Sequence, residues 1–393
     1  MSQRVGIEVS IALGDAVKMA NADVVAAYPI TPQTHIVEHL AELVAEGELD
    51  AEYIPVESEH SAMSACMGSA AAGARTFTAT AGQGLELMHE CLYVASAMRL
   101  PVVMAVANRA LSAPISVWGD HSDVMACRDT GWIQIFTENG QEVVDTALCA
   151  FRIAEDKDVL LPTMVHLDGF HLSHVIEPIM MPEQDQVDAF LPKNQYPFAL
   201  NAEKPVAMGD FAPPAIYTEM KWAQEVNLQK SKETILKTWK EFADAFGREY
   251  KPVESYRCED AKILLLTMGS YSETAMTAID RMRESGAYEN IGLLRLRLWR
   301  PFPAEELREA VKNADVLIVL DRALSFGSTG GPVGMEIKSA LYDVSKKPKI
   351  VNFVGGLGGR DITVAGFEEI IKKGIDIAGS GSENEFEIYG VRE

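Results

Sequence analysis

Short apolar runs alternate with amphipathic stretches along the first hundred residues of the chain. Residues 9–19 and 85–98 have helical periodicity, and a stretch rich in serine, alanine and glycine that starts at about residue 60 predicts a further helix. The predicted strands are 23–30, 52–56, 76–80 and 101–107. Strands that alternate with helices in this way indicate a parallel sheet covered on both faces.

A second series of apolar runs begins after a stretch of different character. Residues 176–252 contain scattered prolines and a charged helix at 218–246, which predicts a connector and not a sheet layer. The later predicted strands are 261–269, 291–297, 316–320 and 350–356. With 393 residues the chain exceeds the size of one hydrophobic core. We therefore expect an α/β protein with two doubly wound domains, 1–255 and 256–393.

Composition and charge exclude several classes of protein. Hydrophobic residues make up 48% of the chain and charged residues 23%, as in ordinary globular proteins. The 57 acidic and 35 basic residues give a net charge of −22, so we expect no nucleic-acid partner. No run approaches the roughly 18–20 apolar residues of a membrane span, and no signal core is seen at the start. We expect a cytoplasmic protein without a membrane partner.

The cysteines form no recognisable ligand set. They are five in number, widely spaced and without a C-x-x-C pair, so the spacing predicts no disulfide frame, no zinc site and no iron–sulfur cluster in this chain. We interpret them as small buried residues and expect no metal ligand. They are Cys66, Cys91, Cys127, Cys149 and Cys258.

Ligands of open α/β sheets bind beyond the carboxyl ends of the strands, where four segments of the first domain carry polar groups. The first is 28–34, where Thr31 is suited to cap a helix and Pro32 to occupy its first position. Free N–H groups there favour a carboxylate or a phosphate, although a capping threonine is usually structural. The second is 56–62, where either Glu57 or Glu59 could merely cap the following helix.

The third segment, 76–84, ends in hydroxyls and glycines that permit a close approach to a ligand, but it is not a phosphate loop. The fourth, 108–123, contains Arg109, whose guanidinium is a good bidentate partner for a small carboxylate substrate. Arg109 could equally pair with Asp120 or Asp123 to hold a loop. His121 is as well suited to a hydrogen bond within that loop as to catalysis.

Taken together, these segments resemble the alpha subunit of pyruvate:ferredoxin oxidoreductases and of relatives that act on other 2-oxoacids. The resemblance covers nearly the whole chain. It rests on Ala27-Tyr-Pro-Ile-Thr-Pro, Val56-Glu-Ser-Glu-His-Ser-Ala, Gly73-Ala-Arg-Thr-Phe-Thr-Ala-Thr, Leu87-Met-His-Glu, Asn108-Arg-Ala-Leu-Ser-Ala-Pro, Gly119-Asp-His-Ser-Asp, Arg128-Asp-Thr-Gly-Trp, Val159-Leu-Leu-Pro, Arg300-Pro-Phe-Pro and Gly355-Gly-Leu-Gly-Gly-Arg-Asp.

The resemblance implies a fold and a set of roles. The first domain would have the thiamine pyrimidine-binding fold and the second a fold like the carboxyl-terminal domain of transketolase. Glu59 would be the catalytic glutamate that hydrogen-bonds the aminopyrimidine ring of thiamine diphosphate. Thr31 and Arg109 would bind the 2-oxoacid. The implied cofactor contacts are Tyr28, Pro29, Ile30, Glu59 and Gln83.

The same resemblance implies partner subunits. Thiamine enzymes usually bind Mg²⁺ and the diphosphate through a Gly-Asp-Gly motif, which this sequence lacks. We expect a cofactor site shared with a partner subunit that supplies Mg²⁺, and [4Fe-4S] clusters in partner subunits only. The expected partners are beta and gamma subunits, with delta as a further candidate, together with ferredoxin, a 2-oxoacid and coenzyme A. The expected reaction converts pyruvate to acetyl-CoA and CO2.

Alternatives and departures stay open at this stage. Pyruvate rests on family frequency, and 2-oxoisovalerate, 2-oxoglutarate or oxalate are alternatives. A scaffold subunit without catalysis is another, whereas a nicotinamide-dependent dehydrogenase would need a glycine fingerprint that is missing. Ala81 and Gly82 stand where relatives commonly carry serines, and Glu86 stands where they usually carry a small apolar residue. No role is assigned to these three.

Overall fold

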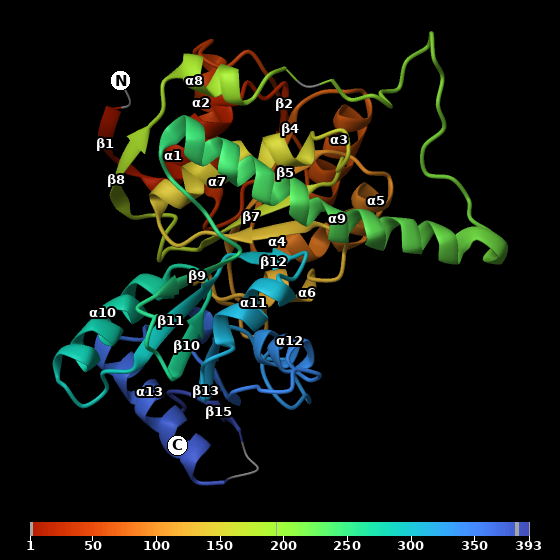
Figure 1. Cartoon of the computed structure of the whole chain (residues 1–393). Helices are drawn as coiled ribbons and strands as arrows, with labels where there is room; N and C mark the ends of the chain where they lie inside the picture. Colours follow the sequence, from red (N-terminus) through yellow and green to blue (C-terminus); the bar gives the residue numbers. More distant parts are fainter. Residues whose placement is uncertain (1–2, 194, 382–384, 393) are drawn as a thin grey trace.

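The computed structural model describes residues 3–193, 195–381 and 385–392 and contains two large sheets, each within its own layers of helices (Figure 1). The first sheet has seven strands in the order β12-β6-β7-β5-β4-β2-β3, and all neighbours are parallel except β12 and β6. Its strands are β2 (Val24–Ala27), β3 (Glu52–Pro55), β4 (Thr76–Thr80), β5 (Val102–Asn108), β6 (Ile133–Phe136), β7 (Thr163–Asp168) and β12 (Leu298–Arg300).

Helices cover both faces of this sheet. Along β5, Val103 and Ala105 pack into one hydrophobic cluster and Val102 and Met104 into another, because successive side chains of a strand point to opposite faces. The first cluster contains α1 (Val9–Met19), α2 (Thr34–Ala45), α7 (Gly140–Ala154) and α9 (Pro214–Phe246). The second contains α3 (Glu59–Ala71), α4 (Gly82–Leu87) and α5 (His89–Ala97). The predicted two-faced sheet is confirmed.

The second sheet has six strands in the order β15-β14-β13-β10-β11-β9, and only β9 is antiparallel to its neighbour. Leu265 packs against one hydrophobic cluster, and Leu264 and Leu266 pack against the other. The strands are β9 (Val253–Tyr256), β10 (Ile263–Thr267), β11 (Ile291–Leu296), β13 (Val316–Asp321), β14 (Lys349–Val354) and β15 (Phe386–Ile388). The helices are α10 (Tyr271–Glu284), α11 (Ala304–Val311), α12 (Pro332–Ala340) and α13 (Val364–Gly379). Two doubly wound domains are thus confirmed.

The two domains interlock. β12 follows β11 in sequence but pairs with β6 of the first sheet, with Leu298 opposite Ile135. The glycine run after β14, which includes the short 3-10 helix η1 (Leu357–Gly359), lies against the first domain: a Cβ on Gly359 would come within 2.5 Å of Trp118. β9 spans the predicted domain boundary at residue 255 and already belongs to the second sheet. The exact boundary therefore stays a prediction.

The connector prediction for 176–252 is wrong in its first part. β8 (Ile176–Met181) pairs antiparallel with β1 (Gln3–Glu8) in a separate two-stranded sheet, and α8 (Gln184–Phe190) follows it. The edge partner of β8 lies about 170 residues earlier in the chain, so local sequence could not reveal the pairing. The charged helix is present as α9, which begins at Pro214 instead of residue 218.

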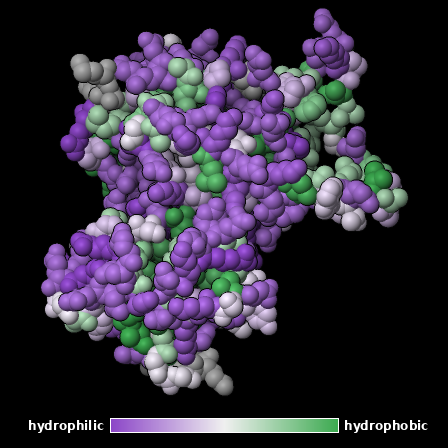
Figure 2. Space-filling model, viewed as in Figure 1, coloured by the Kyte–Doolittle hydropathy of each residue, from purple (hydrophilic) through white to green (hydrophobic). Residues whose placement is uncertain are grey.

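The amino-terminal half of α9 projects from the body of the protein (Figure 1). Its buried residues begin at Leu228, whereas Tyr217 and Trp222 are exposed. Figure 2 shows hydrophobic residues on this projecting segment, on a face of the molecule that is otherwise mostly hydrophilic. In the described part of the chain, none of the helices combines the length and apolarity that a membrane span needs.

Two local predictions need correction. Thr31 does not cap the helix after β2: α2 begins at Thr34 with Gln33 as its N-cap, because residues 31–33 first form a turn in which the Gln33 N–H donates to the Ile30 carbonyl. The helix expected at 85–98 is divided at Met88 into α4 and α5. A further short helix, α6 (Ser122–Ala126), begins at the end of the fourth candidate segment.

Candidate active site

The carboxyl edge of the first sheet brings together Glu59, Arg109, Thr31 and the glycines of α4. β2 leads into the turn that contains Thr31, β3 into the start of α3, β4 into α4, and β5 directly into Arg109. Because these strands are parallel neighbours, their ends lie at one edge. Three of the four candidate segments are therefore joined by direct contacts, and the α3 segment is joined through Gly84.

Glu59 is the first residue of α3 and is only 6% exposed. Ser58 caps the helix by accepting a hydrogen bond from the Ser61 N–H at 3.3 Å, so Glu59 is not needed as the cap. No hydrogen bond to the Glu59 carboxylate occurs within the described residues. Glu57 differs: it is exposed, and its carboxylate accepts a hydrogen bond from Ser61 Oγ at 2.6 Å. Of the two acids, Glu59 is the buried one with free acceptor capacity.

Gly84 of α4 packs directly against this carboxylate. A Cβ at Gly84 would lie 2.6 Å from Glu59 Oε1 and 2.6 Å from Thr80 Oγ1, so any side chain at this position would collide with both. Among the described residues, the buried Thr80 Oγ1 and Gln83 Oε1 have no hydrogen-bond partner. A buried carboxylate beside an unpartnered hydroxyl, with an unpartnered amide oxygen on the residue before Gly84, fits a ligand that presents N–H groups, as the aminopyrimidine ring of thiamine diphosphate does.

Arg109 connects the end of β5 to the turn after β2. Its Nε donates to the Ser116 carbonyl at 2.8 Å and its Nη1 to the Thr31 carbonyl at 3.0 Å. Burial lowers the pKa of Arg109. The negative charges of Asp123 and Glu59 raise this pKa and partly offset the effect of burial. The side chain bonds to backbone carbonyls and not to Asp120 or Asp123, the loop-holding partners that the sequence had left open. Within the described residues Nη2 of Arg109 makes no hydrogen bond, so its N–H groups can donate to another acceptor.

Asp123 joins the end of β5 to the start of α4, which follows β4. Its Oδ2 accepts hydrogen bonds from the backbone N–H groups of Arg109 at 2.9 Å and Gly82 at 3.1 Å, and its Oδ1 accepts from Asn108 Nδ2 at 3.1 Å. Burial raises the pKa of Asp123 to about 7, and these hydrogen bonds act in the opposite direction. Gly82 also has to be small, because a Cβ there would lie 3.0 Å from Arg109 Cδ.

The segment 28–31 lies at the surface of the site. Tyr28, Pro29 and Thr31 are exposed, and Ile30 is partly buried against the core of the first domain. The Tyr28 carbonyl accepts a hydrogen bond from Gln33 Nε2 at 2.8 Å, which fixes the backbone of this turn. The contact that joins this segment to Arg109 is the Thr31 carbonyl, not its hydroxyl. The roles of these four side chains toward a ligand stay predictions.

Sequence reasoning missed a buried polar cluster around Asp168, the last residue of β7. Asp168 lies 2.8 Å from His121 Nε2 and accepts from Ser270 Oγ at 2.6 Å, and its Oδ1 lies 2.5 Å from Arg322 Nη1. Burial lowers the pKa of His121, against the effect of Asp168. His121 therefore takes part in a contact between domains. The sequence signal that could have indicated this cluster is the acidic residue Asp168 at the end of an apolar strand.

Comparison with known proteins shows the family to which the chain is similar. The family model "Pyruvate flavodoxin/ferredoxin oxidoreductase, thiamine diP-bdg" matches residues 15–239, and "Pyruvate:ferredoxin oxidoreductase core domain II" matches residues 261–367. The pyruvate synthase subunit PorA of Methanothermobacter thermautotrophicus is 50% identical over 93% of this chain and 94% of its own length. The ketoisovalerate oxidoreductase subunit VorA of Pyrococcus horikoshii is 44% identical over 95% and 94%.

Solved structures share the fold at low sequence identity. A 2-oxoglutarate:ferredoxin oxidoreductase from Magnetococcus marinus matches 95% of this chain and 66% of its own chain, with a TM-score of 0.72 and 18% identity. A split-gene transketolase matches 95% of this chain and all of its own, with a TM-score of 0.55 and 12% identity. The fold expected from the resemblance is confirmed. With both domains matched by family models, the chain belongs to the pyruvate flavodoxin/ferredoxin oxidoreductase family.

Proposed function

We propose that this chain is the alpha subunit of a pyruvate:ferredoxin oxidoreductase that decarboxylates pyruvate oxidatively and forms acetyl-CoA. The observation that carries the proposal is the buried Glu59 carboxylate, which is packed against Gly84 and has no hydrogen bond within the described residues. Bound thiamine diphosphate would supply the electron sink for the decarboxylation. The cytoplasmic location and the [4Fe-4S] clusters of partner subunits belong to the same proposal.

Glu59 is the proposed acid–base residue. Its carboxylate would accept a hydrogen bond from the aminopyrimidine ring of the cofactor and move a proton there, a role for which burial excludes competing water. Gln83, whose buried Oε1 has no partner in the part of the chain that the structure describes, is proposed as a second contact to the ring. Tyr28, Pro29 and Ile30 are proposed to line the cofactor from the exposed side of the site.

Arg109 and Thr31 are the proposed residues for the 2-oxoacid. Arg109 is held by the Ser116 and Thr31 carbonyls, so its guanidinium is oriented before substrate arrives and can bind a carboxylate through the N–H groups that remain. The exposed Thr31 hydroxyl lies on the same turn. Partner subunits, beta and gamma with delta as a further candidate, are proposed to supply Mg²⁺ and the iron–sulfur clusters, and ferredoxin and coenzyme A are the proposed co-substrates.

The test is Glu59→Gln in the assembled complex, with Glu57→Gln as the matched control on the same segment. We expect Glu59→Gln to preserve folding and assembly but to lower turnover on the order of 100-fold or more, since an amide cannot exchange the proton. Glu57→Gln should keep nearly wild-type turnover because that side chain is exposed and hydrogen-bonded to Ser61. Near-normal turnover of Glu59→Gln would overturn the assignment and favour a scaffold subunit.

The substrate is tested separately. Reduction of a low-potential acceptor would be measured with pyruvate, 2-oxoisovalerate, 2-oxoglutarate and oxalate, with coenzyme A added where the reaction needs it. We expect the highest kcat/KM for pyruvate, given the 50% identity to a pyruvate synthase subunit. A higher value for 2-oxoisovalerate would instead align this chain with the ketoisovalerate relative and overturn the pyruvate assignment.

A further inference from the structure

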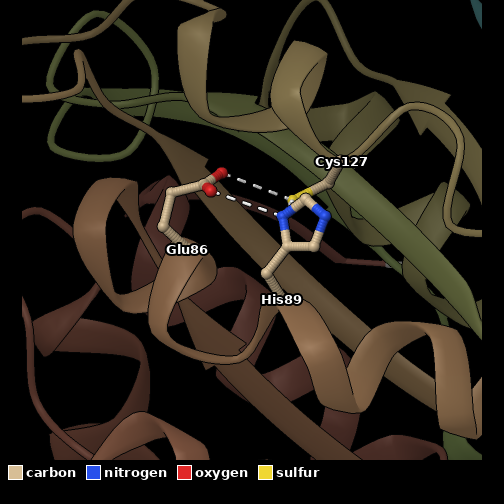
Figure 3. A group of neighbouring side chains, drawn as sticks. All are labelled: Glu86, His89 and Cys127. Atoms are coloured by element: carbon tan, nitrogen blue, oxygen red, sulfur yellow. Dashed lines mark hydrogen bonds and ion pairs between the residues drawn. The ribbon is translucent and has the colours of Figure 1, made fainter.

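Three side chains of different chemistry converge near α4, the helix whose Gly84 packs against Glu59. Glu86 belongs to α4, His89 to the first turn of α5, and Cys127 follows α6 directly. Figure 3 shows the carboxylate, the imidazole and the thiol pointing toward one another. His89 Nδ1 lies 3.3 Å from Glu86 Oε2, and Cys127 Sγ lies 3.6 Å from both Glu86 Oε1 and His89 Nδ1.

These separations match the edges of a zinc coordination tetrahedron. Zinc binds sulfur at about 2.3 Å, nitrogen at about 2.0–2.1 Å and carboxylate oxygen at about 2.0–2.2 Å. Tetrahedral angles then place nitrogen and oxygen ligands about 3.3 Å apart, and sulfur about 3.5–3.6 Å from either. The two oxygens of Glu86 each face one of the other ligands, so a small rotation of the carboxylate can present a single oxygen to the ion.

Hydrogen bonding alone explains the convergence less well. A thiol is a weak donor with a single proton, yet Cys127 Sγ faces both an acid and an imidazole nitrogen. The side chains of Glu86 and His89 are 32% and 31% exposed, so burial does not force them onto one another. Cys127 is fully buried. The arrangement has a buried sulfur and two partly exposed ligands toward solvent.

We propose that Glu86, His89 and Cys127 bind a Zn²⁺ ion, with a water molecule in the fourth position. A mixed set of sulfur, nitrogen and oxygen ligands at tetrahedral spacing favours zinc over Mg²⁺ or Ca²⁺, which prefer six or more oxygen ligands. Binding would release the thiol proton of Cys127 to solvent. The spacing of the cysteines gave no indication of this site, because each ligand comes from a different helix or helix end.

The position of the site gives it a structural consequence for catalysis. Glu86 lies two residues after Gly84, the glycine that packs against Glu59. Zinc would join α4 to α5 and to the end of α6, and would thereby hold the backbone of α4 beside Glu59. The three ligands are positioning residues in this proposal, and none of them touches the reacting groups.

The test measures zinc in the assembled complex. Wild type, Glu86→Gln, His89→Gln, Cys127→Ser and the control Cys91→Ser would be treated with chelator, titrated with Zn²⁺ and analysed by mass spectrometry. Cys91 is a suitable control because it is also buried in this region but faces Ser64. We expect wild type and Cys91→Ser to retain one zinc ion per chain that the ligand variants bind at least about 10-fold more weakly.

Zinc absorption spectroscopy supplies the second measurement. The wild-type complex should show a zinc–sulfur shell at about 2.3 Å that Cys127→Ser lacks. Equal zinc content in wild type and in the two partly exposed variants, Glu86→Gln and His89→Gln, would overturn the proposal. A coordination sphere without sulfur would do the same. Both measurements are independent of turnover, so they stand whether or not the Glu59 proposal survives.

Discussion

Arg322 of the second domain and Asp168 of the first form a buried ion pair, with Arg322 Nη1 2.5 Å from Asp168 Oδ1. Both side chains are at most 2% exposed. Arg322 Nη2 also donates to the Gly119 carbonyl at 2.9 Å, in the loop that leads to His121. The pair therefore joins the two domains next to the start of α6, the helix that carries Asp123, and it links domain packing to the geometry around Arg109.

Asp168→Asn should destabilise the chain strongly. The substitution leaves Arg322 buried without a counter-charge, and breaking a buried pair in this way typically costs roughly 3–5 kcal/mol. The midpoint of urea unfolding of the full chain, followed by tryptophan fluorescence, should fall accordingly. Asp260→Asn is the control: Asp260 pairs with Arg283 at 2.7 Å but lies at the surface, where water screens the charges, so its midpoint should change little.

The same pair predicts a pH dependence. Burial alone raises the pKa of Asp168, but Arg322, His121 and Ser270 together hold that pKa well below its ordinary value of 3.8. The carboxylate therefore contributes stability above about pH 3.8, and this contribution is lost as the pH falls further toward the pKa of the folded state. The stability gap between wild type and Asp168→Asn should narrow below pH 3.8. A gap that widened there would contradict the argument.

Much of the fold was accessible from the sequence because its strands are local apolar runs. β4, β10 and β11 fall within the ranges predicted for them, and α1 has the predicted bounds. The pairing of β1 with β8 and of β12 with β6 was not accessible, since each depends on a partner far away in sequence. The prediction that 176–252 is only a connector failed for this reason.

The candidate site was predictable in its residue types but not in its contacts. Strand-end positions and the family resemblance together indicate Glu59 and Arg109 as site residues. Sequence could not decide which of two nearby acids is buried, because that depends on Gly84 approaching Glu59 from another strand end. It also could not show that Arg109 bonds to carbonyls. The burial of Glu59 and the hydrogen bonds of Arg109 both depend on which strand ends become neighbours in the sheet.

Trp239→Ala and Trp222→Ala on α9 should have very different effects. Trp239 is 1% exposed within the core of the first domain, and its truncation should lower the free energy of unfolding by roughly 3–5 kcal/mol. Trp222 is 68% exposed on the projecting half, so the same change should leave the unfolding midpoint nearly unchanged. Urea unfolding of both full-length variants checks this. Equal destabilisation would mean that the projecting half is packed in solution.

Arg109→Lys should weaken use of the 2-oxoacid more than binding of thiamine diphosphate. A lysine cannot bond to the Ser116 and Thr31 carbonyls and also present a planar pair of donors to a carboxylate. We expect kcat/KM for the acid to fall roughly 10- to 100-fold, with a much smaller change in cofactor affinity. Arg152→Lys, at a surface pair with Glu241, is the control. Equal losses in both quantities would indicate an arginine that only holds the loop.

Gly84→Ala should inactivate the complex without unfolding it. The added methyl group would lie 2.6 Å from both Glu59 Oε1 and Thr80 Oγ1, and it has to displace at least one of them. A displacement of about 1 Å can cost on the order of 100-fold in turnover, while overpacking of this kind costs about 1–3 kcal/mol of stability. Turnover of the complex and urea unfolding of the chain would be measured together.

Gly68→Ala provides the matched control for that substitution. Gly68 lies in α3, the helix that begins with Glu59, but a Cβ there would meet nothing within 4 Å. Alanine at this exposed helical position should raise stability by roughly 0.5–1 kcal/mol and leave turnover unchanged. If Gly84→Ala were as active as Gly68→Ala, the carboxylate of Glu59 would have room to move aside, and its fixed position against α4 could not be what prepares it for catalysis.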